Sequence, residues 1–373
     1  MAAQRKRRKR RRRKNGNIRV IVGAIAVLAA ILIGALVFFA LSADEEKRLP
    51  GESLTQESDG GSEQSGAVNP LTGLYGFDGT KLGSRPIAVM VNNAPAARPQ
   101  WGLCSPDLVF EGVVEGGATR MMWVYADVDD IPKVGSVRSA RHDFVELAEG
   151  MDALFVHWGG SDLAYDAIRQ RAVDDIDGLK YEGKYFFRDN TRNVATEHRG
   201  YTTGEDIRKA IDALGRRTEQ KAKYREPFSF EKEGAPRTLS GGVCQSVSFD
   251  FSSSGSYSHT FHYDAQEGLY YNRIGGEPMR DADGKQMAVS NVILLYCGVR
   301  NTGDSSGHME MDLSGGSGVY ISNGSYESIR WEKGSPSSPL TLKNEKGEEL
   351  TLNAGKSYIG LIPTSRKNNV QIS

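Results

Sequence analysis

The chain has 373 residues, with 47 basic and 47 acidic side chains, 39% apolar residues and three cysteines. This apolar content suffices for sizeable cores and excludes a wholly disordered or collagen-like chain, and three cysteines exclude a small disulfide-dense framework. Eleven of the basic residues lie within residues 1–19, which contain no acidic residue. The formal net charge of zero therefore hides a basic tail joined to a body with an excess of eleven acidic residues.

Residues 20–43 contain no charged side chain. As an α-helix with a rise of ~1.5 Å per residue, this segment would be about 36 Å long, enough to cross a ~30 Å hydrocarbon core, so we predict a transmembrane helix here. The basic residues precede it and Asp44-Glu45-Glu46 follow it, which predicts a cytoplasmic N-terminus and an extracytoplasmic body. A cleaved signal peptide is the alternative, although the apolar stretch exceeds the ~7–15 residues usual for one.

The basic tail, residues 1–19, suits a cytoplasmic determinant of topology that is attracted to anionic lipid. It contains no aromatic residue and adjoins the apolar segment, so we expect no nucleic-acid partner. Residues 44–68 are rich in Ser, Gly, Glu and Gln, which predicts a disordered linker. From residue 69 the composition becomes globular, and we predict a first domain over 69–225 and a second over 226–373.

The first domain combines strand and helix patterns. Apolar runs predict strands at 85–93, 107–115, 119–126 and 153–157, with a hairpin at Gly116-Gly117 between the second and third. The spacing of apolar residues predicts a helix at 139–149, with Ser139 as its N-cap. It predicts two further helices, one that begins after Ser161 and one that begins after Thr203. Because strands and helices do not alternate regularly, we predict an α/β fold built on a mixed sheet and not a doubly wound one.

The second domain reads as mostly β. Alternating apolar residues predict strands at 243–251 and 257–263, and the apolar run 292–296 fits a central strand. Asn323-Gly324, between two such runs, is the strongest hairpin signal in the chain. Cys244 and Cys297 both lie here, so one disulfide is an option, and three unpaired, mostly buried thiols fit equally well.

The densest group of polar residues lies at 133–143 and contains Arg138 and Arg141 at the start of a predicted helix. Helix N-termini carry unsatisfied N–H groups and a partial positive charge, so arginine there is unfavourable unless an anion compensates. A bound phosphate or carboxylate would do so through guanidinium groups and backbone amides together. The structural alternative pairs these arginines with nearby carboxylates (Glu111, Glu115 or Asp143).

Further polar residues lie where predicted strands end or begin. Asn92 and Asn93 close the strand at 85–93, Arg120 opens the strand at 119–126, and His157 precedes a Gly-Gly turn where backbone can approach a ligand. The sequence therefore predicts a binding site for an anionic ligand made of Asn92, Asn93, Arg120, Arg138, Arg141 and His157.

A catalytic site is the competing hypothesis, with Glu111, Glu115 or His157 as acid–base groups. Glu111 and Glu115 share one face of their predicted strand, but four residues at ~3.3 Å place them about 13 Å apart, beyond the ~5–9.5 Å carboxylate separations of glycosidases. Ser161 fits a helix N-cap better than a nucleophile, since no Gly-x-Ser-x-Gly elbow is present.

Metal and cofactor signals are lacking in the sequence. The six histidines are scattered, and His259 and His262, three residues apart on one predicted strand, should face opposite sides. No Walker loop or dinucleotide fingerprint occurs. We therefore expect no metal and no cofactor.

Several strings of the two predicted domains form one pattern. They include NPLTGL at 69–74, RPIAVMVNNAPAARPQWGL at 85–103, EGVVEGGATRMM at 111–122, VGSVRSAR at 134–141, FVHWGGS at 155–161, FFRD at 186–189 and, in the second domain, YSHTFHYDAQEGLYYNR and AVSNVILLY. Together they resemble the YerB-like family of bacterial envelope proteins. The resemblance covers about 69–364 and implies a layered, mixed α/β first domain, a Gram-positive-type envelope location, no known cofactor and no assigned activity. The chain departs from lipoprotein members by having a predicted transmembrane anchor in place of a lipidated cysteine.

Three functions follow as hypotheses. The first is a single-pass, membrane-anchored extracytoplasmic protein that binds an anionic cell-wall polymer or a small anion. The second is an enzyme that acts on envelope polymers by phosphoryl or glycosyl transfer or hydrolysis. The third is a structural protein that docks a membrane partner through its β domain. The sequence leaves the ligand and the oligomeric state open.

Overall fold

The computed structural model describes residues 66–373. The basic tail, the predicted transmembrane helix at 20–43 and most of the predicted linker lie outside these residues. Within the described part of the chain, no helix is both long and apolar enough to cross a membrane. The end of the predicted linker forms a short strand, β1 (Ala67–Val68), which pairs with β2 (Tyr75–Phe77).

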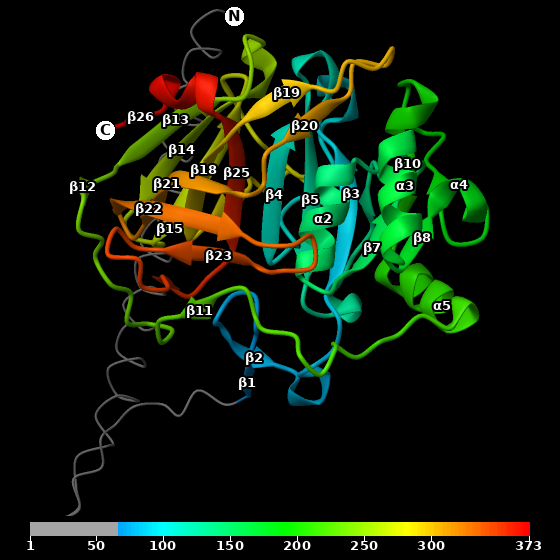
Figure 1. Cartoon of the computed structure of the whole chain (residues 1–373), viewed down its shortest axis with the longest axis horizontal. Coiled ribbons are helices and arrows are strands. Elements are labelled where there is room, and N and C mark those ends of the chain that lie inside the picture. The colour runs from blue at the N-terminus through cyan, green and yellow to red at the C-terminus, as the bar shows by residue number, and fades with distance from the viewer. Residues whose placement is uncertain (1–65) are drawn as a thin grey trace, which may run out of the picture. The chain divides into compact units, whose positions relative to one another are not determined.

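One large mixed sheet runs through the molecule (Figure 1). In order across the sheet its strands are β12 (Gly242–Val243), β22 (Ser325–Lys333), β21 (Gly315–Ser322), β18 (Asn291–Cys297), β25 (Ser357–Pro363), β4 (Leu108–Val113), β5 (Thr119–Tyr125), β3 (Ile87–Asn92), β7 (Leu154–His157) and β8 (Asp175–Asp177), with β23 (Leu340–Lys343) beside β22. This arrangement confirms the predicted mixed sheet.

Six of these strands point the same way: β18, β25, β4, β3, β7 and β8, with antiparallel β5 between β4 and β3. Their residues are buried on both faces, as the nearly continuous apolar runs of parallel central strands require. The parallel pairing of β4 with β25, from Leu108 opposite Ser357 to Gly112 opposite Leu361, carries the sheet across the sequence position where we predict a domain boundary.

A second, antiparallel sheet covers one face of the large one. Its strands are β16 (Glu277–Pro278), β15 (Leu269–Ile274), β14 (Ser258–Asp264), β13 (Ser246–Asp250) and β26 (Gln371–Ile372), with β17 (Ala288–Val289) beside β15. Phe249 and Phe261 of this sheet share a buried cluster with Val89 and Trp123 of the large sheet and with Ile207 of α5 (Gly204–Leu214).

Helices α2 (His142–Gly150) and α3 (Asp162–Arg171) cover the opposite face, where Phe144 and Ala164 pack with Met90 and Met122. The remaining elements are the short helix α4 (Gly178–Tyr181), a small sheet of β6 (Val134–Gly135), β10 (Gly200–Thr202) and β9 (Phe187–Arg188), and the pairs β11 (Ser229–Phe230) with β24 (Thr351–Leu352) and β19 (Val299–Asn301) with β20 (Met309–Met311).

The predicted N-cap of α2 is wrong, whereas the predicted N-caps of α3 and α5 are confirmed. Helix α2 begins at His142, and the residue at its N-cap position is Arg141 and not Ser139. The backbone N–H groups of Arg138 and Ala140 donate to Met90 O and Gly159 O, and these bonds keep 138–140 extended. Ser161 and Thr203 do cap α3 and α5, because their hydroxyl groups accept from the N–H groups three residues on.

The structure also decides the predictions made for the cysteines, the hairpins and the histidines of β14. Cys104, Cys244 and Cys297 are all unpaired, and the last two are buried, so the second of the two cysteine hypotheses is confirmed. Antiparallel pairing of β4 with β5 and of β21 with β22 confirms both predicted hairpins. His259 is buried and His262 exposed, as expected for residues on opposite sides of β14.

Candidate functional site: the carboxyl edge of the large sheet

The carboxyl ends of β3, β4, β7 and β8 meet at one edge of the sheet, because these strands are parallel. The segment that follows β6 is joined to β3 by a bridge from Val137 to Val91, and its Ala140 bridges to Gly160 in the segment that follows β7. In open α/β sheets, ligands bind in the crevice beyond the carboxyl ends of the strands. The predicted arginines are therefore placed where a ligand site is expected.

Three arginines gather at this edge, and among the described residues only Arg141 is paired with a carboxylate. Arg141 is paired through its Nε and Nη2 with both carboxylate oxygens of Glu115, the second at 2.9 Å. Arg120, which is 7% exposed, donates from Nη1 to Ser139 O at 2.6 Å. Among the described residues, neither Arg120 nor Arg138 has a carboxylate oxygen within 4.0 Å of its guanidinium nitrogens.

The electrostatics of the cluster favour an added anion. Burial lowers the pKa of Arg120 well below its ordinary value, and the charges of Arg141 and Arg138 lower it further. Burial also lowers the pKa of Arg138, whereas the nearby charge of Glu197 opposes that shift. A buried guanidinium without a counter-ion is unfavourable, so an anion placed between Arg120 and Arg138 would stabilise both.

A cavity of about 390 Å³ opens at this edge, and Arg138 is one of its lining residues. The segment 188–197 forms another part of the lining. Arg188 donates from Nε to Glu182 Oε1 at 2.6 Å and from Nη1 to Thr196 O at 2.8 Å, and its guanidinium lies 4.4 Å from the ring centre of Trp158. Sequence reasoning did not find this wall, because the segment contains only short irregular elements and no periodic pattern.

The other predicted site residues are distributed around this edge. Asn92 pairs with Arg120 in the sheet, and its Nδ2 lies 2.8 Å from His198 Nδ1. His157 is fully buried, with Nε2 3.1 Å from Asp175 Oδ2 and Nδ1 2.7 Å from Gly159 O, so its side chain holds the turn after β7 in place. The structure thus brings Asn92, Arg120, Arg138 and Arg141 together and gives His157 a supporting position.

Asn93 belongs to a separate, buried polar network on the other face of the sheet. Its Nδ2 donates to Glu111 Oε1 at 2.7 Å. Glu111 also accepts from Tyr358 at 2.9 Å and lies 3.3 Å from His259 Nε2, and all three side chains are fully buried or nearly so. Burial alone would raise the pKa of Glu111, but the charge and hydrogen bond of His259, with two hydroxyl groups, outweigh it and lower that pKa.

The positions of Glu111, Glu115 and His157 argue against the catalytic hypothesis. Glu111 packs with His259 on the side of the antiparallel sheet, whereas His157 stacks on Phe155 and lies beside Tyr165 of α3 on the other side. Glu115 is paired with Arg141 at the sheet edge. The three proposed acid–base residues therefore occupy three different environments and do not share a pocket.

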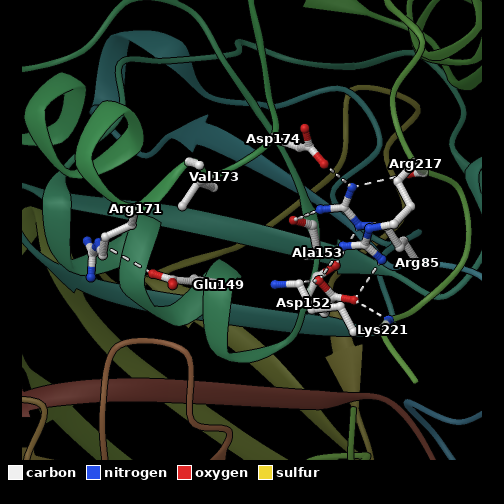
Figure 2. A pocket seen from close by; sticks show the side chains of 10 residues that line it. Arg85, Glu149, Asp152, Ala153, Arg171, Val173, Asp174, Arg217 and Lys221 are labelled. Atoms are coloured by element: carbon white, nitrogen blue, oxygen red, sulfur yellow. Dashed lines mark hydrogen bonds and ion pairs between the residues drawn. The ribbon is translucent and has the colours of Figure 1, made fainter. Parts of the chain in front are cut away.

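A second cavity, of about 240 Å³, lies at the opposite, amino edge of the parallel strands (Figure 2). Its charged side chains satisfy one another. Arg85 donates to Asp174 Oδ2 at 2.6 Å and to the backbone oxygens of Asp152 and Ala153, while Arg217 forms a bidentate pair with Asp152. This ionic junction ties the 216–221 segment to the sheet, and each basic side chain that lines the cavity has a carboxylate partner within 4.0 Å.

Replacing Arg85 with alanine should reduce the free energy of unfolding by about 2 kcal/mol, because charge-assisted hydrogen bonds to buried carbonyl groups are lost. The loss is moderated since Asp174 keeps Arg216 as a partner. Arg85→Lys should restore part of the stability. Urea unfolding followed by tryptophan fluorescence measures both, with Arg300→Ala, which removes an exposed pair with Glu310, as a control expected to change little. An Arg85→Ala protein as stable as the wild type would contradict the structural role of the junction.

Comparison with known proteins places the chain in a family. The N-terminal and C-terminal domain models of the protein family of unknown function DUF3048 match residues 71–217 and 247–359. A protein of Bacillus subtilis (strain 168) described as "Putative lipoprotein YerB" is 30% identical over 298 residues, which cover 79% of this chain and 86% of that protein. The chain belongs to the DUF3048 family.

The fold of this DUF3048 chain also matches a solved structure. The crystal structure of the YerB protein from Bacillus subtilis superposes with a TM-score of 0.72 at 29% sequence identity, over 82% of this chain and 99% of that one. The resemblance of the sequence motifs to the YerB-like family is thereby confirmed. The family is one of unknown function, so it assigns no role to the residues at the carboxyl edge.

Proposed function

We propose that this chain is a membrane-anchored, extracytoplasmic protein of the cell envelope that binds an anionic ligand, a wall polymer or a smaller anion, at the carboxyl edge of its large sheet. The observation that carries the proposal is the pair Arg120 and Arg138, two partly or fully buried guanidinium groups without a carboxylate within 4.0 Å in the described part of the chain. Arg and backbone donors at a strand-to-helix edge suit phosphate or carboxylate groups.

The proposed location rests on two observations. The Bacillus relative is described as a putative lipoprotein, and the apolar segment 20–43 of this chain is preceded by basic residues and followed by acidic ones. The first cysteine is Cys104, so the segment 20–43, and not a lipidated cysteine, would serve as the anchor. The acidic body repels anions at long range, so the local arginines must provide the attraction and added salt should weaken binding only modestly.

Arg138→Ala should weaken the binding of tripolyphosphate to the full-length protein by tenfold or more, since a charge-assisted hydrogen bond contributes about 1.5–3 kcal/mol. Isothermal titration measures the affinity. Arg330→Ala, which removes an exposed arginine of β22, is the matched control and should bind as the wild type does. Equal affinity of the wild type and the Arg138→Ala protein, or no binding by either, would reject the proposed site.

A further inference from the structure

We propose that the 390 Å³ cavity beside Arg138 accepts an anion that carries hydroxyl groups, a sugar or polyol phosphate or a sugar acid, and that Glu197 selects for the hydroxyl groups. This inference rests on the proposed function and names its class of ligand. The cavity is lined by both a cation, Arg138, and a carboxylate, Glu197. A site built only for a bare anion would exclude that carboxylate.

Glu197 is available to a ligand. Its side chain is exposed, and in residues 66–373 no basic side chain comes within 4.0 Å of its carboxylate. A backbone hydrogen bond lowers the pKa of Glu197, and the charges of Arg138, His198 and Arg188 lower it further, which keeps the carboxylate ionised. An ionised carboxylate only accepts hydrogen bonds, so it binds hydroxyl groups and repels phosphate oxygens.

Trp158 forms one wall of the cavity. It is only 7% exposed, and its indole N–H has no acceptor among the described residues. The ring is fixed closely, because a Cβ at Gly178 or Gly200 would come within 2.8 Å of its carbons. Because the ring is fixed, it gives the cavity a rigid wall on this side.

These groups together define the ligand. Arg138 donates hydrogen bonds, Glu197 accepts them, and Leu179, which is 60% exposed, adds an apolar wall. An anion without hydroxyl groups can use Arg138 and is opposed by Glu197. A polyol phosphate can use all of them, with its phosphate at Arg138 and a hydroxyl group at Glu197.

The test compares glycerol 1-phosphate with propyl phosphate, which has the same phosphate and carbon skeleton without the hydroxyl groups. Isothermal titration of the full-length wild type should give about tenfold tighter binding of glycerol 1-phosphate, as expected for one hydrogen bond to a charged group. Glu197→Gln should remove most of this preference without weakening the binding of propyl phosphate. Because Glu197 is exposed, the variant should keep the circular dichroism spectrum of the wild type.

The outcomes separate the two proposals. Equal affinities for the two phosphates, lost together in Arg138→Ala, would overturn the hydroxyl-selective cavity and leave the anion site standing. Binding of tripolyphosphate but of neither monoester would do the same. A preference for glycerol 1-phosphate that survives Glu197→Gln would remove Glu197 as its cause. If no anion binds at all, both proposals fail.

Discussion

Replacing Glu111 with alanine should lower the free energy of unfolding by about 3–5 kcal/mol, the largest effect expected in this protein. Glu111 and His259 are both buried and lie 3.3 Å apart, and removing one partner of a buried pair leaves the other group without its counter-charge. His259 Nδ1 also lies 3.1 Å from Asn272 Oδ1, so the ring is held between two polar partners, and Glu111→Ala removes one of them.

Glu111→Gln is the matched variant, because it keeps the shape and a hydrogen-bonding carbonyl group but removes the charge. We expect its loss to be intermediate between the wild type and Glu111→Ala. Urea unfolding of the full-length protein measures all three, and Glu205→Ala, which breaks an exposed pair with Lys209, should cost about 0.5 kcal/mol or less. A loss below about 1 kcal/mol for Glu111→Ala would show that the pair does not hold the two layers together.

The contribution of Asp143 to the stability of the protein should fall as the pH rises from 5 to 8. Burial raises the pKa of this carboxyl group to about 7, although the N–H of Met311 donates to it at 3.1 Å. An unfolded aspartate ionises near pH 4. Between these values the folded protein binds more protons than the unfolded chain, so stability falls with rising pH, by roughly 2–3 kcal/mol between pH 5 and 8.

Asp143→Asn should remove this dependence and make the protein more stable than the wild type at pH 8, since asparagine still accepts from Met311 and never ionises. Unfolding free energies at pH 5 and pH 8 for both proteins provide the measurement. Glu111, whose pKa is lowered, acts with the opposite sign only below about pH 4. Burial lowers the pKa of His142 and of His198, which oppose Asp143 below about pH 6.5 in both proteins, so the difference between the two profiles isolates Asp143. Parallel pH profiles of the two proteins would exclude Asp143 as the cause.

The elements predicted correctly are those whose signal is local. The strand at 85–93 became β3 and the strand at 119–126 became β5, because short apolar runs between turn residues report burial directly. The start of α2 was missed, since Ser139 has the right chemistry for a cap but its neighbours are held extended by bonds to β3 and to the β7–α3 turn. Tertiary bonds there override a local preference.

Half of the candidate site could also be predicted from local signals in the sequence. Arg120 and Arg138 stand at the ends of recognisable elements, and the structural alternative for Arg141, a pair with Glu115, proved correct. Glu197 and Arg188 lie on a segment without periodicity, so nothing in the sequence linked them to Arg138. The Glu111–His259 pair spans 148 residues, and no local pattern can report a contact across that distance.

The place of β25 in the large sheet affects how the protein can be made. Its residues Ser357–Pro363 lie between β4 and β18, and β4 leaves the ribosome long before them. A nascent chain that stops before residue 357 exposes two unpaired strand edges and leaves Glu111 without its bond to Tyr358. Such edges invite aggregation. A product that is truncated before β25 should therefore be cleared by quality control, because the large sheet closes only after β25 has been made.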